Sequence, residues 1–160
     1  MARTRSRPKP SKEKRLRTRR THCPRCGKKM WSAYVSHRAV STLEGVYRIH
    51  SHVRRCRDPS CSGYHKPYRP EAEGRIALPQ HEFGLDVIAL IGTLRYQQHR
   101  TVPEMHQELR RRGLDICERT VTNLLDRYDE LVSIRLSDSR RLQALTQKQW
   151  RVILALDGLQ

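Results

Sequence analysis

The sequence predicts a small β module built around a metal site, then an all-α helix-turn-helix unit, and finally the first strand of a further sheet domain. Three observations predict this order. Two close pairs of cysteines lie between residues 22 and 66, apolar residues recur at helical spacing from Leu85 onward, and a continuous apolar run follows Trp150. The period of the hydrophobic pattern therefore changes from two residues to 3.6, as expected when strands are followed by helices.

The two cysteine pairs have the spacings Cys-x2-Cys and Cys-x4-Cys. They are formed by Cys23, Cys26, Cys56 and Cys61. Four thiolates form a tetrahedral site that suits Zn²⁺. Two disulfides are the alternative, but the N-terminal residues show no hydrophobic stretch of a secretory signal, and disulfides belong mainly to oxidising compartments. We therefore expect these cysteines to bind one structural zinc ion.

Residues 22–66 show the pattern of short strands around the cysteine pairs. Residues 46–53 alternate bulky and polar side chains, and Glu44-Gly45 is typical of a turn. This pattern predicts a zinc ribbon, a set of small β-hairpins that depend on the metal for stability. His22 and His65 stand beside the pairs and could replace one cysteine ligand, whereas His50 and His52 are expected to face solvent or nucleic acid.

The net positive charge of the chain lies in its first 70 residues. The formal net charge is +17, and residues 1–70 hold 20 Lys and Arg against three acidic residues, whereas residues 71–160 hold 13 of each. Such a footprint favours nucleic acid as the partner. We expect residues 1–21 to be a disordered basic arm that binds phosphates. The candidate phosphate contacts are Arg15, Arg17, Arg19, Arg20, Arg54 and Arg55.

The longest apolar run before residue 100, residues 87–94, is too short to span a membrane. We expect no membrane partner and a cytoplasmic, nucleoid-associated protein in a reducing compartment.

Residues 67–80 contain three prolines and a glycine, which predicts a linker. Beyond it, residues 81–134 are expected to form a helix-turn-helix DNA-binding domain. The first helix centres on the apolar residues after Leu85, the second begins with a capping box between Thr101 and Glu104, and Gly113 ends it. The third helix carries side chains able to contact bases or phosphates. These are Arg119, Thr120, Thr122, Asn123 and Arg127. An ordinary three-helix bundle with a solvated polar face is the alternative.

Residues 135–149 are a polar connector, and residues 150–160 contain the apolar run that ends in Asp157-Gly158. A continuous apolar run of this length is typical of a buried strand in a mixed or parallel sheet. Ligand and metal sites favour the carboxyl end of such strands. We expect this strand to begin a domain that the chain does not contain.

The ordered combination of these features resembles the N-terminal part of insertion-sequence transposases of the DDE type, whose catalytic core is RNase H-like. The residues that carry the resemblance are the four cysteines, residues 118–128 (ERTVTNLLDRY) and residues 153–158 (ILALDG). The resemblance implies that Asp157 is the first carboxylate of an incomplete catalytic triad. It also implies that the strand at residues 150–160 starts a truncated α/β RNase H-like domain.

On this resemblance, the chain recognises transposon-end DNA, and only a full-length parent would use Mg²⁺ or Mn²⁺ to cleave and transfer DNA strands. The chain alone is expected to be inactive. Double-stranded DNA is the expected partner, with a homodimer as one option. Two other functions stay open: a free-standing zinc-ribbon and helix-turn-helix transcription regulator, and an RNA-associated basic zinc protein.

Overall fold

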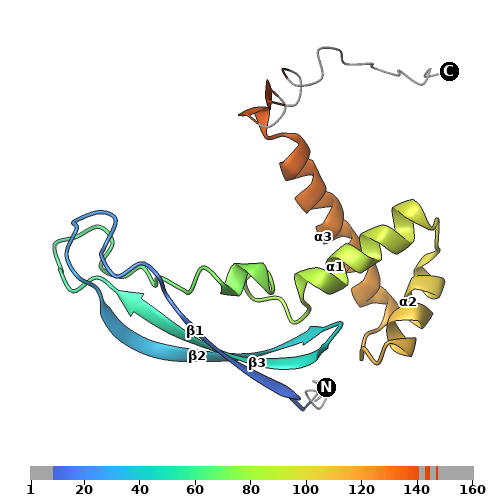
Figure 1. Cartoon of the computed structure of the whole chain (residues 1–160), viewed down its shortest axis with the longest axis horizontal. Helices are drawn as coiled ribbons and strands as arrows, with labels where there is room; N and C mark the ends of the chain where they lie inside the picture. The colour runs from blue at the N-terminus through green and yellow to red at the C-terminus, as the bar shows by residue number, and fades with distance from the viewer. Residues whose placement is uncertain (1–8, 141–142, 145–146, 148–160) are drawn as a thin grey trace.

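A three-stranded sheet and a group of three α-helices make up the computed structural model, which describes residues 9–140, 143–144 and 147 (Figure 1). The predicted order of a small β module followed by helices is therefore confirmed. The elements are β1 (Lys12–Arg17), β2 (Trp31–Thr42), β3 (Gly45–Arg55), η1 (Glu73–Arg75), α1 (Leu85–Gly92), η2 (Thr93–Gln97), α2 (Val102–Arg111) and α3 (Glu118–Leu136).

The sheet is mixed, with the strand order β1-β3-β2. β2 and β3 form an antiparallel hairpin in which Thr42 pairs with Gly45 at one end and Trp31 pairs with Arg55 at the other. The two-residue turn lies at Leu43 and Glu44, one position before the predicted turn at Glu44-Gly45. The hairpin places the beginning of β2 beside the end of β3. The cysteines that precede β2 therefore meet the cysteines that follow β3.

The prediction that the whole of residues 1–21 is disordered was wrong for residues 12–17, which form β1. This strand pairs in parallel with β3, and Leu16 is its one buried side chain. Leu16 joins Val40, Ile49 and Ala77 in a small core beneath the sheet. The charged sequence of residues 12–17 did not predict a strand, because β3 supplies its hydrogen-bond partners and most of the apolar surface around Leu16. Residues 1–8 lie outside the described residues.

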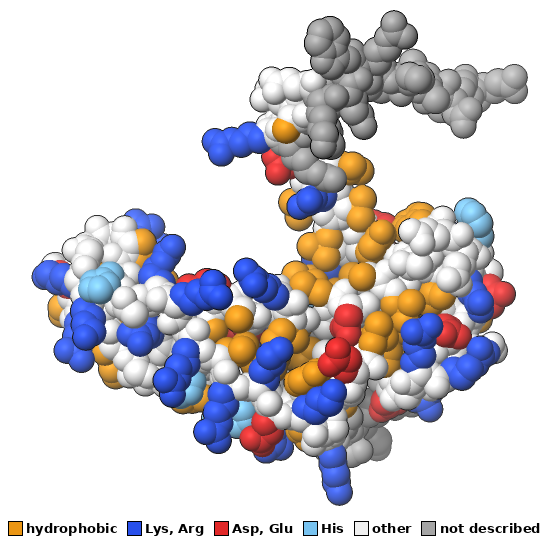
Figure 2. Space-filling model, in the orientation of Figure 1, with side chains coloured by type: hydrophobic (Ala, Val, Ile, Leu, Met, Phe, Trp, Pro, Cys, Tyr) orange, Lys and Arg blue, Asp and Glu red, His pale blue; other side chains and the backbone are white. Residues whose placement is uncertain are grey.

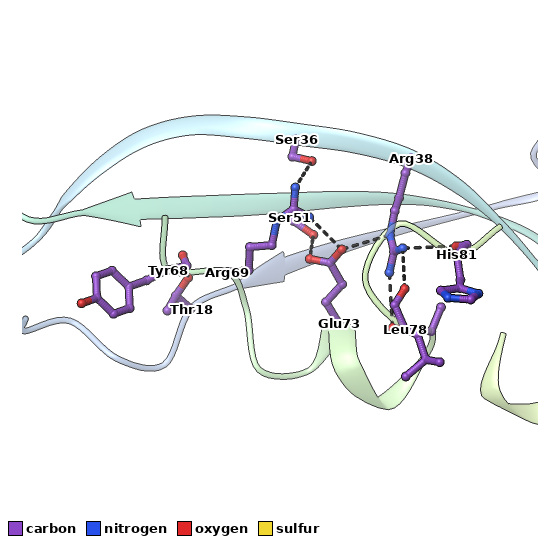
Figure 3. A network of polar contacts seen from close by, with 10 residues as sticks. Thr18, Ser36, Arg38, Ser51, Tyr68, Arg69, Glu73, Leu78 and His81 are labelled. Atoms are coloured by element: carbon purple, nitrogen blue, oxygen red, sulfur yellow. Dashed lines mark hydrogen bonds and ion pairs between the residues drawn. The ribbon is translucent and has the colours of Figure 1, made fainter. Parts of the chain in front are cut away.

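The predicted linker at residues 67–80 is packed against the sheet instead of running free. Tyr68 exchanges two backbone hydrogen bonds with Arg54, and the short helix η1 follows it. Glu73 on η1 is buried, and its carboxylate accepts hydrogen bonds from Ser51 and Arg69 (Figure 3). Proline and glycine therefore mark the turns of this segment, while a buried polar network holds it in place.

The helices share a core that is separate from the one beneath the sheet. Its fully buried members come from all three α-helices and from the turn between α2 and α3, and they include Val87, Ile91, Met105, Leu109 and Val121. Three helices are thus observed as predicted. Their use as a DNA-binding helix-turn-helix is a question of function.

The ends of α2 follow the sequence closely. Thr101 and Glu104 form the predicted capping box, in which the Thr101 backbone N–H and hydroxyl both donate to the Glu104 carboxylate at 2.8 and 2.7 Å. At the other end, Gly113 has a φ of 83°. The N–H groups of Gly113 and Leu114 donate to carbonyl oxygens of the last helical turn, which is the Schellman arrangement.

Several expectations fall on residues that the structure does not describe. The strand at residues 150–160, with Asp157 and the start of an RNase H-like domain, lies outside the described residues, as does part of the connector at 135–149. Among the described helices, none is both long and apolar enough to cross a membrane.

Candidate metal centre

The four predicted cysteines converge at the end of the β2–β3 hairpin. Their sulfur atoms all lie within 4.8 Å of one another. The Sγ atoms of Cys23 and Cys61 are 3.8 Å apart, and those of Cys26 and Cys56 are 3.5 Å apart. A tetrahedral ion with Zn–S bonds of about 2.3 Å would separate its sulfur ligands by about 3.8 Å. The cluster therefore has the dimensions of a four-thiolate metal site.

Each half of the centre is a tight turn whose backbone N–H groups point at a sulfur atom. The Asp58 N–H lies 3.5 Å from Cys56 Sγ, and the Gly63 N–H lies 3.3 Å from Cys61 Sγ. In the first turn, Gly27 adopts a φ of 70° and donates to the Cys23 carbonyl at 2.9 Å. The Asp58 and Gly63 N–H groups stabilise thiolates, because each places a partial positive charge beside a sulfur atom.

The thiols of the cluster differ in pKa because backbone N–H groups, burial and the neighbouring thiols act on them unequally. Backbone N–H groups of Cys26 and Arg25 lower the pKa of Cys23 to about 6. Although the Asp58 N–H acts to lower the pKa of Cys56, burial and the neighbouring thiols raise that pKa to about 12. Four thiolates cannot coexist in this space without a counter-charge, and a bound divalent cation supplies one.

Two further groups support the second turn. Asp58 accepts hydrogen bonds from Lys28 Nζ at 2.6 Å and from the backbone and hydroxyl of Ser60, and the Lys28 ammonium first, then Ser60, lower its pKa to about 2. Gly63 is buried so close to the sulfurs that a Cβ atom there would lie 3.3 Å from Cys23 Sγ. Sequence reasoning missed both residues. Their positions two residues after Cys56 and Cys61 are the signal that could have identified them.

The two histidine alternatives stand outside the cluster. His22 and His65 are both exposed. His22 Nδ1 lies 2.9 Å from the Thr21 hydroxyl, and the His65 ring contacts Tyr64 edge-on. Within the described part of the chain, the four cysteines are the one group of three or more Cys, His, Asp or Glu side chains that could share an ion. No histidine is needed to complete the site, and the four cysteines form no disulfide.

The predicted phosphate contacts divide into two groups. Arg15, Arg17, Arg19 and Arg20 are exposed on and just beyond β1. Arg54 and Arg55 are half-buried at the end of β3, beside the metal centre, and the Arg55 guanidinium lies 5.4 Å from the ring centre of Tyr34.

The predicted base contacts all lie on α3 but differ in exposure. Arg119, Thr122 and Asn123 are exposed, whereas Thr120 and Arg127 are half-buried. Arg127 forms an ion pair with Glu130, and with Thr120 and Asn123 it lines a hollow against residues 80–83. Of the five predicted contacts, Arg119, Thr122 and Asn123 are therefore accessible to a ligand, and the Thr122 hydroxyl donates to the Glu118 carbonyl at 3.2 Å.

No protein-family model matches the chain, and neither the curated proteins nor the solved structures contain a match to it. Function is therefore inferred from the residues themselves.

Proposed function

We propose that the four cysteines bind one structural Zn²⁺ and that the module they stabilise binds double-stranded DNA. The observation that carries the proposal is the position of the cysteine cluster. It closes the end of the sheet that lies within residues 1–70, where the entire net positive charge of the chain resides. A small apolar core of four buried residues beneath this sheet makes metal binding the natural source of its stability.

Zinc fits this cluster better than disulfides do. The Sγ–Sγ distances of 3.8 Å (Cys23 to Cys61) and 3.5 Å (Cys26 to Cys56) link sulfurs of different pairs and are far from the ~2.05 Å of a disulfide bond. All four sulfurs are also mutually close, as one shared ion requires, whereas two disulfides need only pairwise contact. The ion would act structurally, because four protein ligands leave no open position for a substrate.

Duplex DNA fits the distribution of charge. Residues 1–70 would supply most of the affinity through phosphate contacts, which are independent of sequence. The exposed residues of α3, Arg119 and Asn123 above all, would supply sequence preference by reaching base edges, since arginine pairs well with guanine and asparagine with adenine.

The resemblance to DDE transposases gives this binding a biological setting. On that basis we propose that the chain is the DNA-binding N-terminal portion of an insertion-sequence transposase and recognises transposon-end DNA. Asp157 would then be the first catalytic carboxylate, and Mg²⁺ or Mn²⁺ would be used only by a full-length parent.

Competition between nucleic acids tests this proposal. A labelled duplex bound by the zinc-loaded protein is challenged with unlabelled duplex DNA or with structured RNA of equal length. We expect duplex DNA to compete at lower concentration and chelation of zinc to abolish binding. Stronger competition by the RNA would favour the RNA-associated alternative and overturn the proposal.

A further inference from the structure

We infer that the solvent-facing side of the three-stranded sheet is the surface that binds the phosphate backbone of duplex DNA. This inference rests on the proposed DNA binding and assigns it to one face of the fold. The face, called the outer face below, is defined by its strand positions. These are Glu13, Arg15 and Arg17 on β1, Arg48, His50, His52 and Arg54 on β3, and Val35, His37 and Ala39 on β2.

Strand alternation separates this face from the core. Leu16, Ile49 and Val40 point to the other side of the sheet, where they are buried against Ala77. Successive side chains of a strand alternate between the two sides, so the residues between them face solvent. In register, Arg15 pairs with His50 and His50 pairs with His37, so cationic and imidazole groups form rows across the three strands.

The outer face carries positive charge that the protein does not neutralise. It holds four arginines and three histidines against one acid, Glu13. Arg15, Arg17 and Arg48 are exposed, and none of them forms an ion pair with another described residue. Figure 2 shows Lys, Arg and His side chains along the lower edge of the molecule, beneath the strands.

The arginines of the helical part differ in this respect. Arg110 pairs with Asp115 at 2.7 Å, and Arg111 and Arg112 pair with Glu108 at 3.2 and 2.8 Å. On the outer face, by contrast, Glu13 lies 3.7 Å from His50 and, although Arg48 is its register partner, forms no ion pair with an arginine of the described residues. The three exposed arginines of the outer face are therefore not neutralised by ion pairs, whereas the three arginines of the helical part are.

The dimensions of the face suit a double helix. Arg48 and Arg54 lie six positions apart on β3, which corresponds to about 20 Å along the strand. The major groove is about 12 Å wide, so arginines at both ends of this row can reach phosphates on opposite sides of a groove.

The side chains of the face also favour a duplex over a single strand. Single-strand binding proteins use exposed aromatic rings on which bases stack. No Phe, Tyr or Trp occupies the outer face as defined above. The exposed aromatic residues of β2, Trp31 and Tyr34, lie on the opposite side: Tyr34 pairs with the buried Val53, and a bulge between Ser32 and Tyr34 brings Trp31 to the same side.

The test compares two triple variants with the same change of charge. Arg15→Ala/Arg17→Ala/Arg48→Ala removes the exposed outer-face arginines, and Arg110→Ala/Arg111→Ala/Arg112→Ala removes three arginines from α2 and its C-cap. Binding to a 25-base-pair duplex is measured between 50 and 200 mM salt, with zinc content and circular dichroism as checks of folding. Each lost phosphate contact should reduce the slope of log affinity against log salt by about 0.9.

We expect the outer-face variant to lose about two to three units of slope and the α2 variant to lose less than one. The charge-preserving variant Arg15→Lys/Arg17→Lys/Arg48→Lys should keep most of the wild-type slope, which separates loss of phosphate contacts from a folding defect. Equal slopes for wild type and the outer-face alanine variant would overturn the inference while leaving DNA binding intact. Absence of duplex binding by the wild type would instead overturn the proposed function.

Discussion

The carboxylate of Glu73 on η1 lies 3.0 Å from Nε of Arg38 on β2, although the two residues are 35 positions apart in the sequence. The same carboxylate accepts hydrogen bonds from Ser51 at 2.8 Å and Arg69 at 3.0 Å. The other guanidinium nitrogens of Arg38 donate to backbone carbonyls in the segment at residues 77–81 (Figure 3). One buried acid thereby attaches the segment between the metal centre and α1 to the sheet.

Replacing Glu73 by alanine should destabilise the protein strongly. Two guanidinium groups and the Ser51 hydroxyl would lose their acceptor, and breaking a buried charge pair typically costs about 3–5 kcal/mol. Urea unfolding of zinc-loaded protein measures the change. Glu71→Ala is the control, since Glu71 accepts one exposed backbone hydrogen bond from Arg19, and its loss should cost about 1 kcal/mol or less. Equal destabilisation by the two substitutions would contradict the role given to the buried network.

A second prediction concerns the close approach of Gly63 to the metal centre. In Gly63→Ala, the new Cβ would lie 3.2 Å from the Tyr68 hydroxyl and 3.3 Å from Cys23 Sγ, so the ligand sulfur or its neighbours must move. Changes beside a metal ligand commonly reduce metal affinity about 10- to 100-fold. Competition with a chromogenic zinc chelator measures this loss.

Gly74→Ala is the matched control, because a Cβ atom on Gly74 meets nothing within 4 Å. It should retain zinc as the wild type does. Equal zinc affinity in Gly63→Ala and the wild type would show that the centre tolerates the displacement, contrary to the importance given to the close approach of Gly63.

The features that the sequence predicted are those set by short-range chemistry. The turn between β2 and β3, the capping box of Thr101 and Glu104 and the stop at Gly113 each depend on residues close together in the chain. The structure has all three, with the turn one residue before its predicted position. The convergence of the two cysteine pairs follows from one further step, the antiparallel pairing of β2 with β3.

The features that could not be predicted from the sequence depend on partners far away in the chain. Residues 12–17 have one buried apolar side chain, Leu16, and no alternating pattern, so only pairing with β3 makes them a strand. Proline-rich residues 67–80 gave no sign that Glu73 would be buried beneath Ser51. The contacts of α3 with DNA stay predictions, since an exposed polar face on a helix does not by itself specify a ligand.

The third prediction separates affinity from sequence preference on α3. Binding-site selection from random duplexes is followed by comparison of the selected site with a scrambled duplex. Arg119→Ala and Asn123→Ala should each reduce the preference by about 1–3 kcal/mol, which is roughly 5- to 150-fold, with a smaller effect on binding to the scrambled duplex.

Arg135→Ala is the control on the same helix, since Arg135 is exposed near its C-terminal end. It should leave the preference unchanged. If Arg119→Ala and Asn123→Ala behave like the control, α3 does not contact bases and its polar face is solvated.

The fourth prediction is that the 160-residue chain neither cuts nor joins DNA with Mg²⁺ or Mn²⁺. Two-metal phosphoryl transfer needs several carboxylate oxygens around the ions, and the resemblance identifies only Asp157. Among the described residues, no group of carboxylates is arranged to hold a metal ion. Incubation with duplex DNA and Mn²⁺, followed by denaturing electrophoresis, tests this directly. Strand cleavage that disappears in Asp157→Ala would show that this polypeptide is itself a nuclease.

The most direct test of the account is the metal content of the intact chain. Native mass spectrometry is applied to protein purified without added zinc, under reducing conditions, together with a Cys26→Ser variant. Four thiolates at tetrahedral spacing should hold one Zn²⁺ per chain, with an apparent binding energy of about 10–16 kcal/mol at neutral pH. We expect one zinc ion in the wild type and a marked loss of zinc in the variant. A wild-type chain that carries no metal although its four cysteines are reduced would contradict the account.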